Sequence, residues 1–126
     1  MHGIGATTWV IPEGHIPESS TGPPPQMTSH GTMSILNTND EPARIEVEIY
    51  FSDREPVGPY RLEVHPRRTL HARFNELVDP APLPRGTDFA SVIRSDRPVV
   101  VQHTRLDSRQ AENALMTTMA YTPGVD

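Results

Sequence analysis

Proline is spread so densely through the first hundred residues that a long helix has little room there. The chain of 126 residues contains 14 prolines, and a proline inside a helix removes a backbone donor and clashes with the preceding turn. Two segments, PESSTGPPPQ (17–26) and VDPAPLPRGTD (78–88), are so rich in proline that we expect loops there. The core is therefore expected to come from short strands.

Apolar and polar residues alternate strictly in the segment ARIEVEIYFS (43–52). This period of two is typical of an antiparallel strand with one face buried and the other in water. Ile45, Val47, Ile49 and Phe51 fall on one face, and Arg44, Glu46, Glu48 and Tyr50 fall on the other. Further strands are expected at residues 7–11, 32–37, 59–66, 69–75, 88–95, 98–106 and 116–122.

Seven or eight short strands at this spacing predict a fold class. We expect a single all-β domain over residues 1–126, built as an antiparallel β-sandwich or a jelly-roll-like fold. At most one short helical turn is expected, around Asp107–Leu115, with Ser108 as its cap.

The composition narrows the class of protein further. The chain has no cysteine, so disulfides and thiolate metal sites are excluded and a reducing cytoplasm is the simplest location. No apolar run approaches the ~20 residues that span a bilayer, so no membrane insertion is expected. The formal net charge of −5 argues against nonspecific binding to nucleic acid.

The most concentrated polar chemistry follows three valines in the segment VVVQHTRLD (99–107). On a strand, His103 and Arg105 share the face of the inward-pointing valines, whereas Thr104 faces the other way. Arg105 offers a planar fork to a carboxylate or a polyol, and Asp107 is placed to pair with Arg105, with Arg109 or with a ligand hydroxyl. A ligand pocket and a purely structural Arg–Asp network both fit this pattern.

Two N-terminal residues are further candidates for the same site. Trp9 is the single tryptophan of the chain; its ring fits either the core or a stacking platform for a sugar. Glu13 follows four residues later, and it is either a solvated carboxylate or a ligand-binding group.

Motifs for catalysis and for metal binding are missing. The sequence has no GxSxG, GxGxxG, GxxxxGK[ST] or HExxH segment, so we expect no catalytic residues, no cofactor and no metal site. Arg67 and Arg68, with Arg61 and Arg73 nearby, are a candidate DNA contact, although an arginine pair in a turn is commonly a solvated surface.

Four long segments of the chain resemble the sensory rhodopsin transducer family. They are YFSDREPVGPYRLEV (50–64), RRTLHARFNEL (67–77), DPAPLPRGTDFASVI (79–93) and PVVVQHTRLDSRQAENAL (98–115). The resemblance implies a non-catalytic cytoplasmic β-sandwich that assembles as a homotetramer and binds a small molecule such as a sugar. The alternative that it implies is an adaptor that docks on the cytoplasmic face of a sensory rhodopsin, with DNA binding and transcriptional regulation as a further role.

The resemblance also suggests which residues line a pocket. Trp9 and Glu13 stand in a matching W-x-x-x-E-G block, and the QHTRLDSRQ block (102–110) matches as well. The residues expected to bind the ligand are Trp9, Glu13, His103, Thr104, Arg105 and Asp107.

Overall fold

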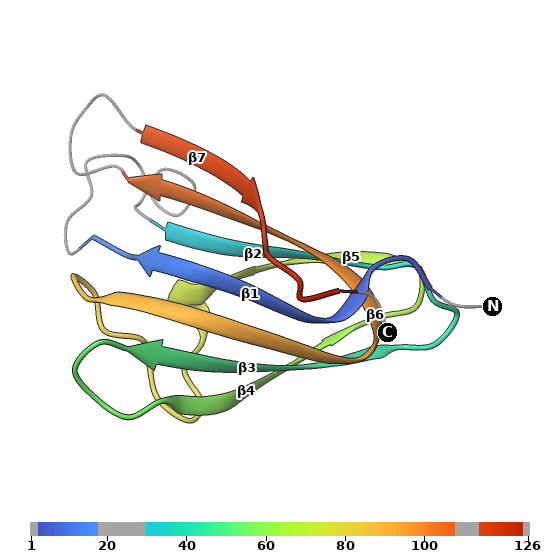
Figure 1. The fold of residues 1–126 in the computed structure, drawn as a ribbon, viewed down its shortest axis with the longest axis horizontal. Coiled ribbons are helices and arrows are strands. Elements are labelled where there is room, and N and C mark those ends of the chain that lie inside the picture. Colours follow the sequence, from blue (N-terminus) through green and yellow to red (C-terminus); the bar gives the residue numbers. More distant parts are fainter. Residues whose placement is uncertain (1–2, 18–29, 108–113, 125–126) are drawn as a thin grey trace.

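Seven strands and one short 3₁₀ turn make up the described part of the computed structural model, which comprises residues 3–17, 30–107 and 114–124 (Figure 1). Every strand pairing is antiparallel, so the predicted all-β antiparallel class is confirmed. In chain order the elements are β1 (Ala6–His15), β2 (His30–Asn37), β3 (Ala43–Phe51), β4 (Val57–Val64), β5 (Arg68–Arg73), η1 (Phe74–Glu76), β6 (Asp88–Asp107) and β7 (Ala114–Met119).

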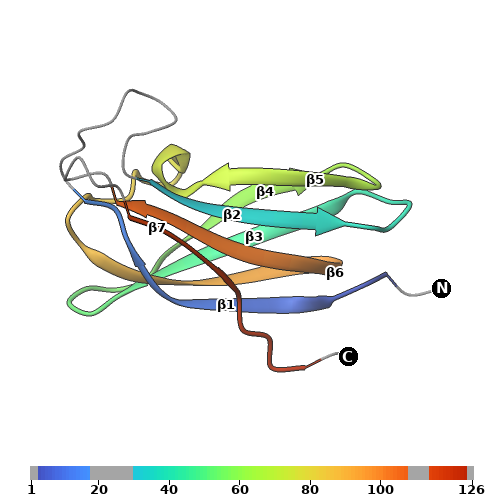
Figure 2. The same ribbon diagram turned by 90° about the horizontal axis from the view of Figure 1, so that it is seen from above.

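The strand β6 belongs to both sheets of the fold. Its first arm, residues 88–95, pairs with β1 and β3, and its second arm, residues 100–107, pairs with β2 and β7. Figures 1 and 2 show the chain doubling back between the two arms. One sheet therefore has the order β4-β3-β6-β1 and the other has the order β5-β2-β6-β7. The sequence predicted the two arms as separate strands, and the structure joins them into one bent element.

Two asparagines tie the turns together at the end where β6 doubles back. Asn37 is fully buried, and its Nδ2 donates a hydrogen bond to the carbonyl of Val64 at 3.1 Å. Asn39 Nδ2 donates to the carbonyl of Pro98 at 2.8 Å, and the N–H of Arg67 donates to the carbonyl of Asn39 at 3.1 Å. Leaving a buried polar group without its partner costs about 1–3 kcal/mol, so these amides fix the β2–β3 turn, the β4–β5 turn and the bend relative to one another.

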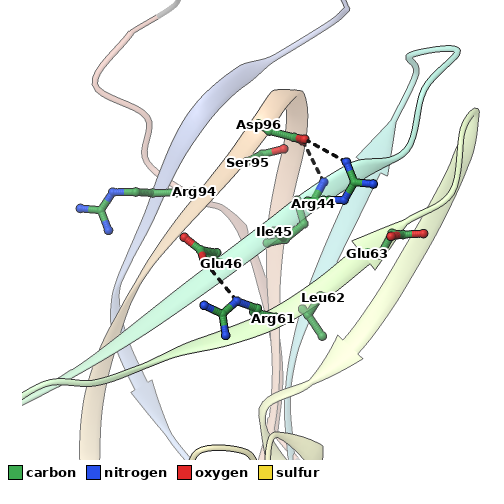
Figure 3. A pocket seen from close by; sticks show the side chains of 9 residues that line it. All are labelled: Arg44, Ile45, Glu46, Arg61, Leu62, Glu63, Arg94, Ser95 and Asp96. Atoms are coloured by element: carbon green, nitrogen blue, oxygen red, sulfur yellow. Dashed lines mark hydrogen bonds and ion pairs between the residues drawn. The ribbon is translucent and has the colours of Figure 1, made fainter.

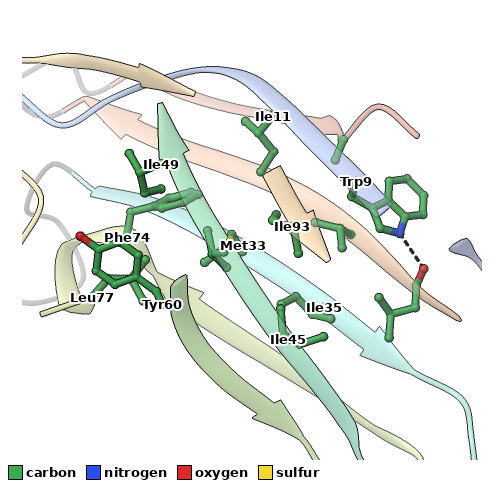
Figure 4. Close-up of a cluster of buried hydrophobic side chains, with 14 of the residues drawn as sticks. Trp9, Ile11, Met33, Ile35, Ile45, Ile49, Tyr60, Phe74, Leu77 and Ile93 are labelled. Carbon is green, nitrogen blue, oxygen red and sulfur yellow. Dashed lines mark hydrogen bonds between the residues drawn. The ribbon is translucent and has the colours of Figure 1, made fainter. Parts of the chain in front are cut away.

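The inward faces of the two sheets meet in a hydrophobic core (Figure 4). In β3 the burial alternates as the sequence predicted, with Ile45, Val47 and Ile49 buried and Arg44 and Glu46 exposed. Burying one such side chain contributes about 1.5–3 kcal/mol. The largest fully buried side chains are those of Tyr60, Phe74, Ile16, Met33, Ile35, Ile45, Ile49, Ile93, Val47, Val64, Val99 and Val101.

Trp9 of β1 lies in this core. Its side chain is buried, and the indole Nε1 donates to the carbonyls of Val99 at 2.9 Å and Ala6 at 3.1 Å (Figure 4). The ring and its one polar group are thus both used by the fold. Of the two roles that the sequence left open for Trp9, the structure shows the packing role.

The one helical turn among the described residues lies in a different place from the one predicted. It is η1, and the predicted turn around Asp107–Leu115 is wrong at both of its ends, because Asp107 pairs with Ala114 and Leu106 pairs with Leu115. Cross-strand pairing here outweighs the helical propensity of the local sequence. Ser108, its predicted cap, lies outside the described residues. No helix in the described residues is long and apolar enough to cross a membrane.

The seam between β1 and β7 closes at one point and then opens. Val10 and Tyr121 exchange both backbone hydrogen bonds, at 2.7 and 2.8 Å. In an antiparallel ladder the next such pair lies two residues further along each strand, which here would be Pro12 and Met119. Proline has no N–H to donate, and the register of β1 on β6 also shifts between Ile11 and Gly14. The two strands therefore separate at Pro12.

Candidate functional site

The opening between β1 and β7 forms a pocket of about 240 Å³. Its walls come from β1 and β7, and two polar side chains of β6 project into it between them. The lining residues are Ile11, Pro12, Glu13, His103, Arg105, Met116, Thr117, Thr118, Met119 and Ala120. Three of the residues predicted to bind a ligand, Glu13, His103 and Arg105, are brought together here from segments about 90 residues apart in the chain.

An ion pair crosses the pocket from β6 to β1. Arg105 Nη1 donates to Glu13 Oε1 at 3.1 Å. The two side chains differ in exposure: that of Arg105 is 17% exposed, whereas that of Glu13 is 71% exposed. The guanidinium is therefore part of the pocket wall, and the carboxylate sits at the edge in contact with water.

His103 is the buried polar group of the pocket. Its side chain stacks edge-to-face against Phe74 of η1, with the ring centroids 6.1 Å apart, and Gly31 of β2 faces its Nε2 side. Burial lowers the pKa of His103, the charge of Arg105 lowers it further, and the carboxylate of Glu13 raises it by less. The imidazole is therefore neutral at pH 7, when it offers one donor and one acceptor.

The other predicted ligand-binding residues lie elsewhere. Trp9 is in the core, as described above. Thr104 points to the outer face of its sheet, where its hydroxyl is 3.2 Å from that of Thr117. Asp107 ends β6, and its side chain lies outside the described part of the structure. Strand alternation separates Thr104 from His103 and Arg105, so the three do not share a cavity.

The candidate DNA contact, Arg67 and Arg68, lies at the opposite end of β2 from the pocket. Arg68 pairs with Asn37 at the last residue of β2, whereas Arg105 pairs with Gly31 near its start. Both arginines are exposed. The guanidinium of Arg68 donates to the carbonyls of its own turn, at 3.0 Å to Arg67. The pocket and the arginine pair are therefore separate surfaces.

A wider hollow of about 640 Å³ lies on the outer face of the other sheet (Figure 3). Its charged side chains alternate in sign across neighbouring strands: Arg44 pairs with Asp96 at 3.9 Å, and Arg61 pairs with Glu46 at 3.4 Å. Both pairs are largely exposed, and exposed pairs of this kind contribute at most about 1 kcal/mol each. Their charges compensate each other in solvent, so we regard this hollow as a solvated sheet surface and the smaller pocket as the candidate site.

Sequence reasoning missed the contribution of β7 to the pocket. The segment was predicted as a strand, but nothing marked Met116 and Thr118 as lining residues. Pro12 was the available signal, because a proline inside a strand pattern indicates an interrupted ladder. In the described parts of the chain no group of three His, Cys, Asp or Glu side chains lies close enough to hold a metal ion.

Comparisons with known proteins place this architecture. The fold and the site define a small antiparallel β-sandwich domain with a pocket between β1 and β7, in which a few polar side chains stand on an apolar lining. The Anabaena sensory rhodopsin transducer family matches residues 4–122, and the chain belongs to this family. The expectation from the sequence is thus confirmed.

Two solved structures are similar to the chain. One is named Anabaena sensory rhodopsin transducer; it is 59% identical with a TM-score of 0.73, and the match covers 80% of this chain and 98% of that one. The other, "Crystal Structure of Thermotoga maritima 1070", is 35% identical with a TM-score of 0.83, and the match covers 94% and 95% of the two chains. A search of curated proteins finds no match.

The lowered pKa of His103 predicts how stability depends on pH. Below about pH 6.5 the unfolded chain binds a proton at this imidazole that the folded chain does not. The free energy of unfolding is therefore expected to fall as the pH drops from about 6.5, and less steeply in His103→Gln. Urea unfolding between about pH 5 and pH 8 measures both slopes. His71→Gln, which removes an exposed imidazole, is the control, and equal slopes for His103→Gln and the wild type would contradict the prediction.

Proposed function

We propose that this chain is a non-catalytic signalling domain that binds a small polar molecule, a sugar or a related metabolite, between β1 and β7. The observation that carries the proposal is the convergence of Arg105, Glu13 and neutral His103 on one pocket of about 240 Å³. Ligand sites typically combine an apolar lining with a few polar groups that fix orientation. Here Ile11 and Met116 supply apolar surface.

Binding in this place has a route to a signal. A ligand that contacts both walls of the pocket holds β1 and β7 together where Pro12 separates them. The same strand β7 carries Thr117 and Met119, which pair with Thr104 and Gln102 on the outer face of the sheet. A ligand bound in the pocket, on one side of β7, is therefore expected to shift the outer face of the sheet on the other side of the same strand.

We further propose that this outer face joins copies of the chain into a cytoplasmic homotetramer. The segment of β7, ALMTTM, has no charged residue, and the side chains of Leu115 and Met119 are 67% and 56% exposed. Among the described residues β7 pairs with β6 alone. An uncharged apolar edge strand readily associates unless something covers it, and a second copy meets that need.

A second candidate function is docking on a sensory rhodopsin. It is favoured by the 59% identical structure, whose name is Anabaena sensory rhodopsin transducer. The net charge of −5 suits the excess of Lys and Arg in the cytoplasmic loops of membrane proteins. DNA binding has less support, because the same net charge repels phosphates and the guanidinium of Arg68 donates to the carbonyls of Pro66 and Arg67.

The ligand proposal predicts a thermal shift that depends on the pocket. At about 100 times its Kd, a ligand adds about 2.7 kcal/mol of stability, so a hit from a library of sugars and metabolites raises the Tm measurably. Arg105→Gln and His103→Gln are expected to lose the shift, whereas Arg61→Gln, on the opposite sheet, keeps it. If no compound raises the Tm of the folded wild type, the proposal is wrong.

The assembly proposal predicts a change of mass. Leu115→Lys combined with Met119→Lys places charge on the face that joins the copies, and the tetramer is expected to dissociate in light scattering coupled to size exclusion. Val78→Lys is the matched control, because Val78 is 63% exposed on a different surface. A monomeric wild type, or a double variant that stays tetrameric, rules out this face as the interface.

The docking proposal predicts binding that salt weakens. Purified Anabaena sensory rhodopsin in detergent is expected to co-elute with this chain at low salt and to release it at high salt, since screened charges steer such contacts weakly. The Anabaena transducer serves as the positive control. Failure of this chain to co-elute at low salt, while the Anabaena transducer does, argues against docking on that receptor.

A further inference from the structure

The two residues of the ion pair that crosses the pocket differ in how far they are exposed to solvent. The side chain of Arg105 is 17% exposed and lies in the wall, whereas the side chain of Glu13 is 71% exposed. Their contact is a single one, from Nη1 to Oε1 at 3.1 Å. A guanidinium has five N–H donors and can bind both oxygens of a carboxylate at once. Glu13 thus makes one hydrogen bond to Arg105, where a carboxylate can make two.

The backbone around Glu13 allows its side chain to leave. Glu13 follows Pro12, where the ladder with β7 has ended, and it lies within the register shift of β1 between Ile11 and Gly14. Rotating this side chain into water breaks no pairing between β1 and β6. Because the carboxylate is already largely hydrated, its release costs little solvation free energy.

The interior of the pocket favours negative charge. At the buried His103, the charge of Arg105 lowers the pKa by more than the carboxylate of Glu13 raises it. Met116 and Ile11 add apolar surface, which limits screening by water. When Glu13 turns out into water, the neutral imidazole beside the guanidinium leaves one net positive group facing the cavity, with a donor and an acceptor available for a hydroxyl.

We propose that the ligand is a small hydroxy carboxylic acid whose carboxylate replaces Glu13 on Arg105 and whose hydroxyl binds His103. The inference rests on the proposed ligand-binding function and narrows its chemistry. The pocket of about 240 Å³ has the volume of about eight waters at ~30 Å³ each, which suits a ligand of sugar-acid size. In the free protein Glu13 takes the place of the ligand carboxylate.

A neutral sugar would use the same residues differently. Its hydroxyls would bridge Glu13 and Arg105 and leave their ion pair in place, so removing the Glu13 charge would weaken its binding. A carboxylate competes with Glu13, so removing that charge strengthens its binding. The variant Glu13→Gln therefore separates the two chemistries by the sign of its effect.

The experiment measures Kd by titration calorimetry for two acids, glycerate and gluconate, and for their uncharged counterparts, glycerol and glucose. We expect at least one acid to bind the wild type about tenfold more tightly than its counterpart, as a charged hydrogen-bonded pair implies. Glu13→Gln should tighten binding of that acid severalfold, and Arg105→Gln should abolish it. Glu46→Gln, which removes the carboxylate partner of Arg61 outside the pocket, makes the same change in net charge and should have no effect.

The site of binding is read from the methyl resonance of Met116, which lies across the strand pair from Arg105. If Arg105→Gln does not fold, Glu13→Gln and Glu46→Gln still decide the sign. The inference is wrong if neither acid binds, if the uncharged compounds bind as tightly, or if Glu13→Gln weakens the acid. A neutral compound that shifts Met116 while both acids fail leaves the ligand-binding function in place and overturns the carboxylate alone.

Discussion

The bend of β6 is the constraint on which the rest of the structure depends. One strand supplies the centre of both sheets, with the arm 88–95 between β1 and β3 and the arm 100–107 between β2 and β7. The bend is held by the hydrogen bond from Asn39 to the carbonyl of Pro98, and Asn39 is in turn bound by buried Asn37. Because both sheets share this strand, the position of one sheet sets the position of the other. The inward valines of β6 therefore meet the isoleucines of β3 in one core.

The same geometry explains where the pocket forms. The two arms carry β1 and β7 on the same side of the fold, and Val10 of β1 exchanges a pair of backbone hydrogen bonds with Tyr121, two residues beyond the end of β7. Beyond that point Pro12 cannot donate, so the sheets stay apart and the polar end of β6 is left between them. His103 and Arg105 lie on the inward face of β6 because they continue the alternation of the valines. At this point β1 and β7 do not meet over that face. The pocket thus forms where β1 and β7 separate, and its polar residues stand on the side of β6 that faces the core elsewhere.

Much of this could be read from the sequence, and the reasons are local. Alternation in the segment 43–52 gave the strand and its buried face, and the same alternation put His103 and Arg105 on one side of β6 with Thr104 on the other. The helical turn expected around Asp107–Leu115 is wrong at its two ends because propensity is a local preference, whereas Asp107 pairs with Ala114 and Leu106 pairs with Leu115 across two strands. Trp9 stands near Glu13 in the chain but lies in the core, since alternation alone does not say how deep a face is buried. No local pattern shows which distant strand lies beside a given one.

By itself the sequence determined the all-β class, the strand faces, the family resemblance and the polar group at the end of the long valine strand. The class and the strand faces depend on the period of two and on the long helices that proline excludes, and both are properties of short segments. The family resemblance depends on four longer blocks of sequence. Only the tertiary structure decided that Glu13 meets Arg105 across 92 positions of the chain at 3.1 Å, that Arg105 is half-buried while Glu13 is exposed, and that β7 forms the second wall. Those outcomes follow from the sharing of β6 by two sheets. The physical reason is that a strand can pair along both of its edges, whereas its local sequence does not specify which distant strands pair there.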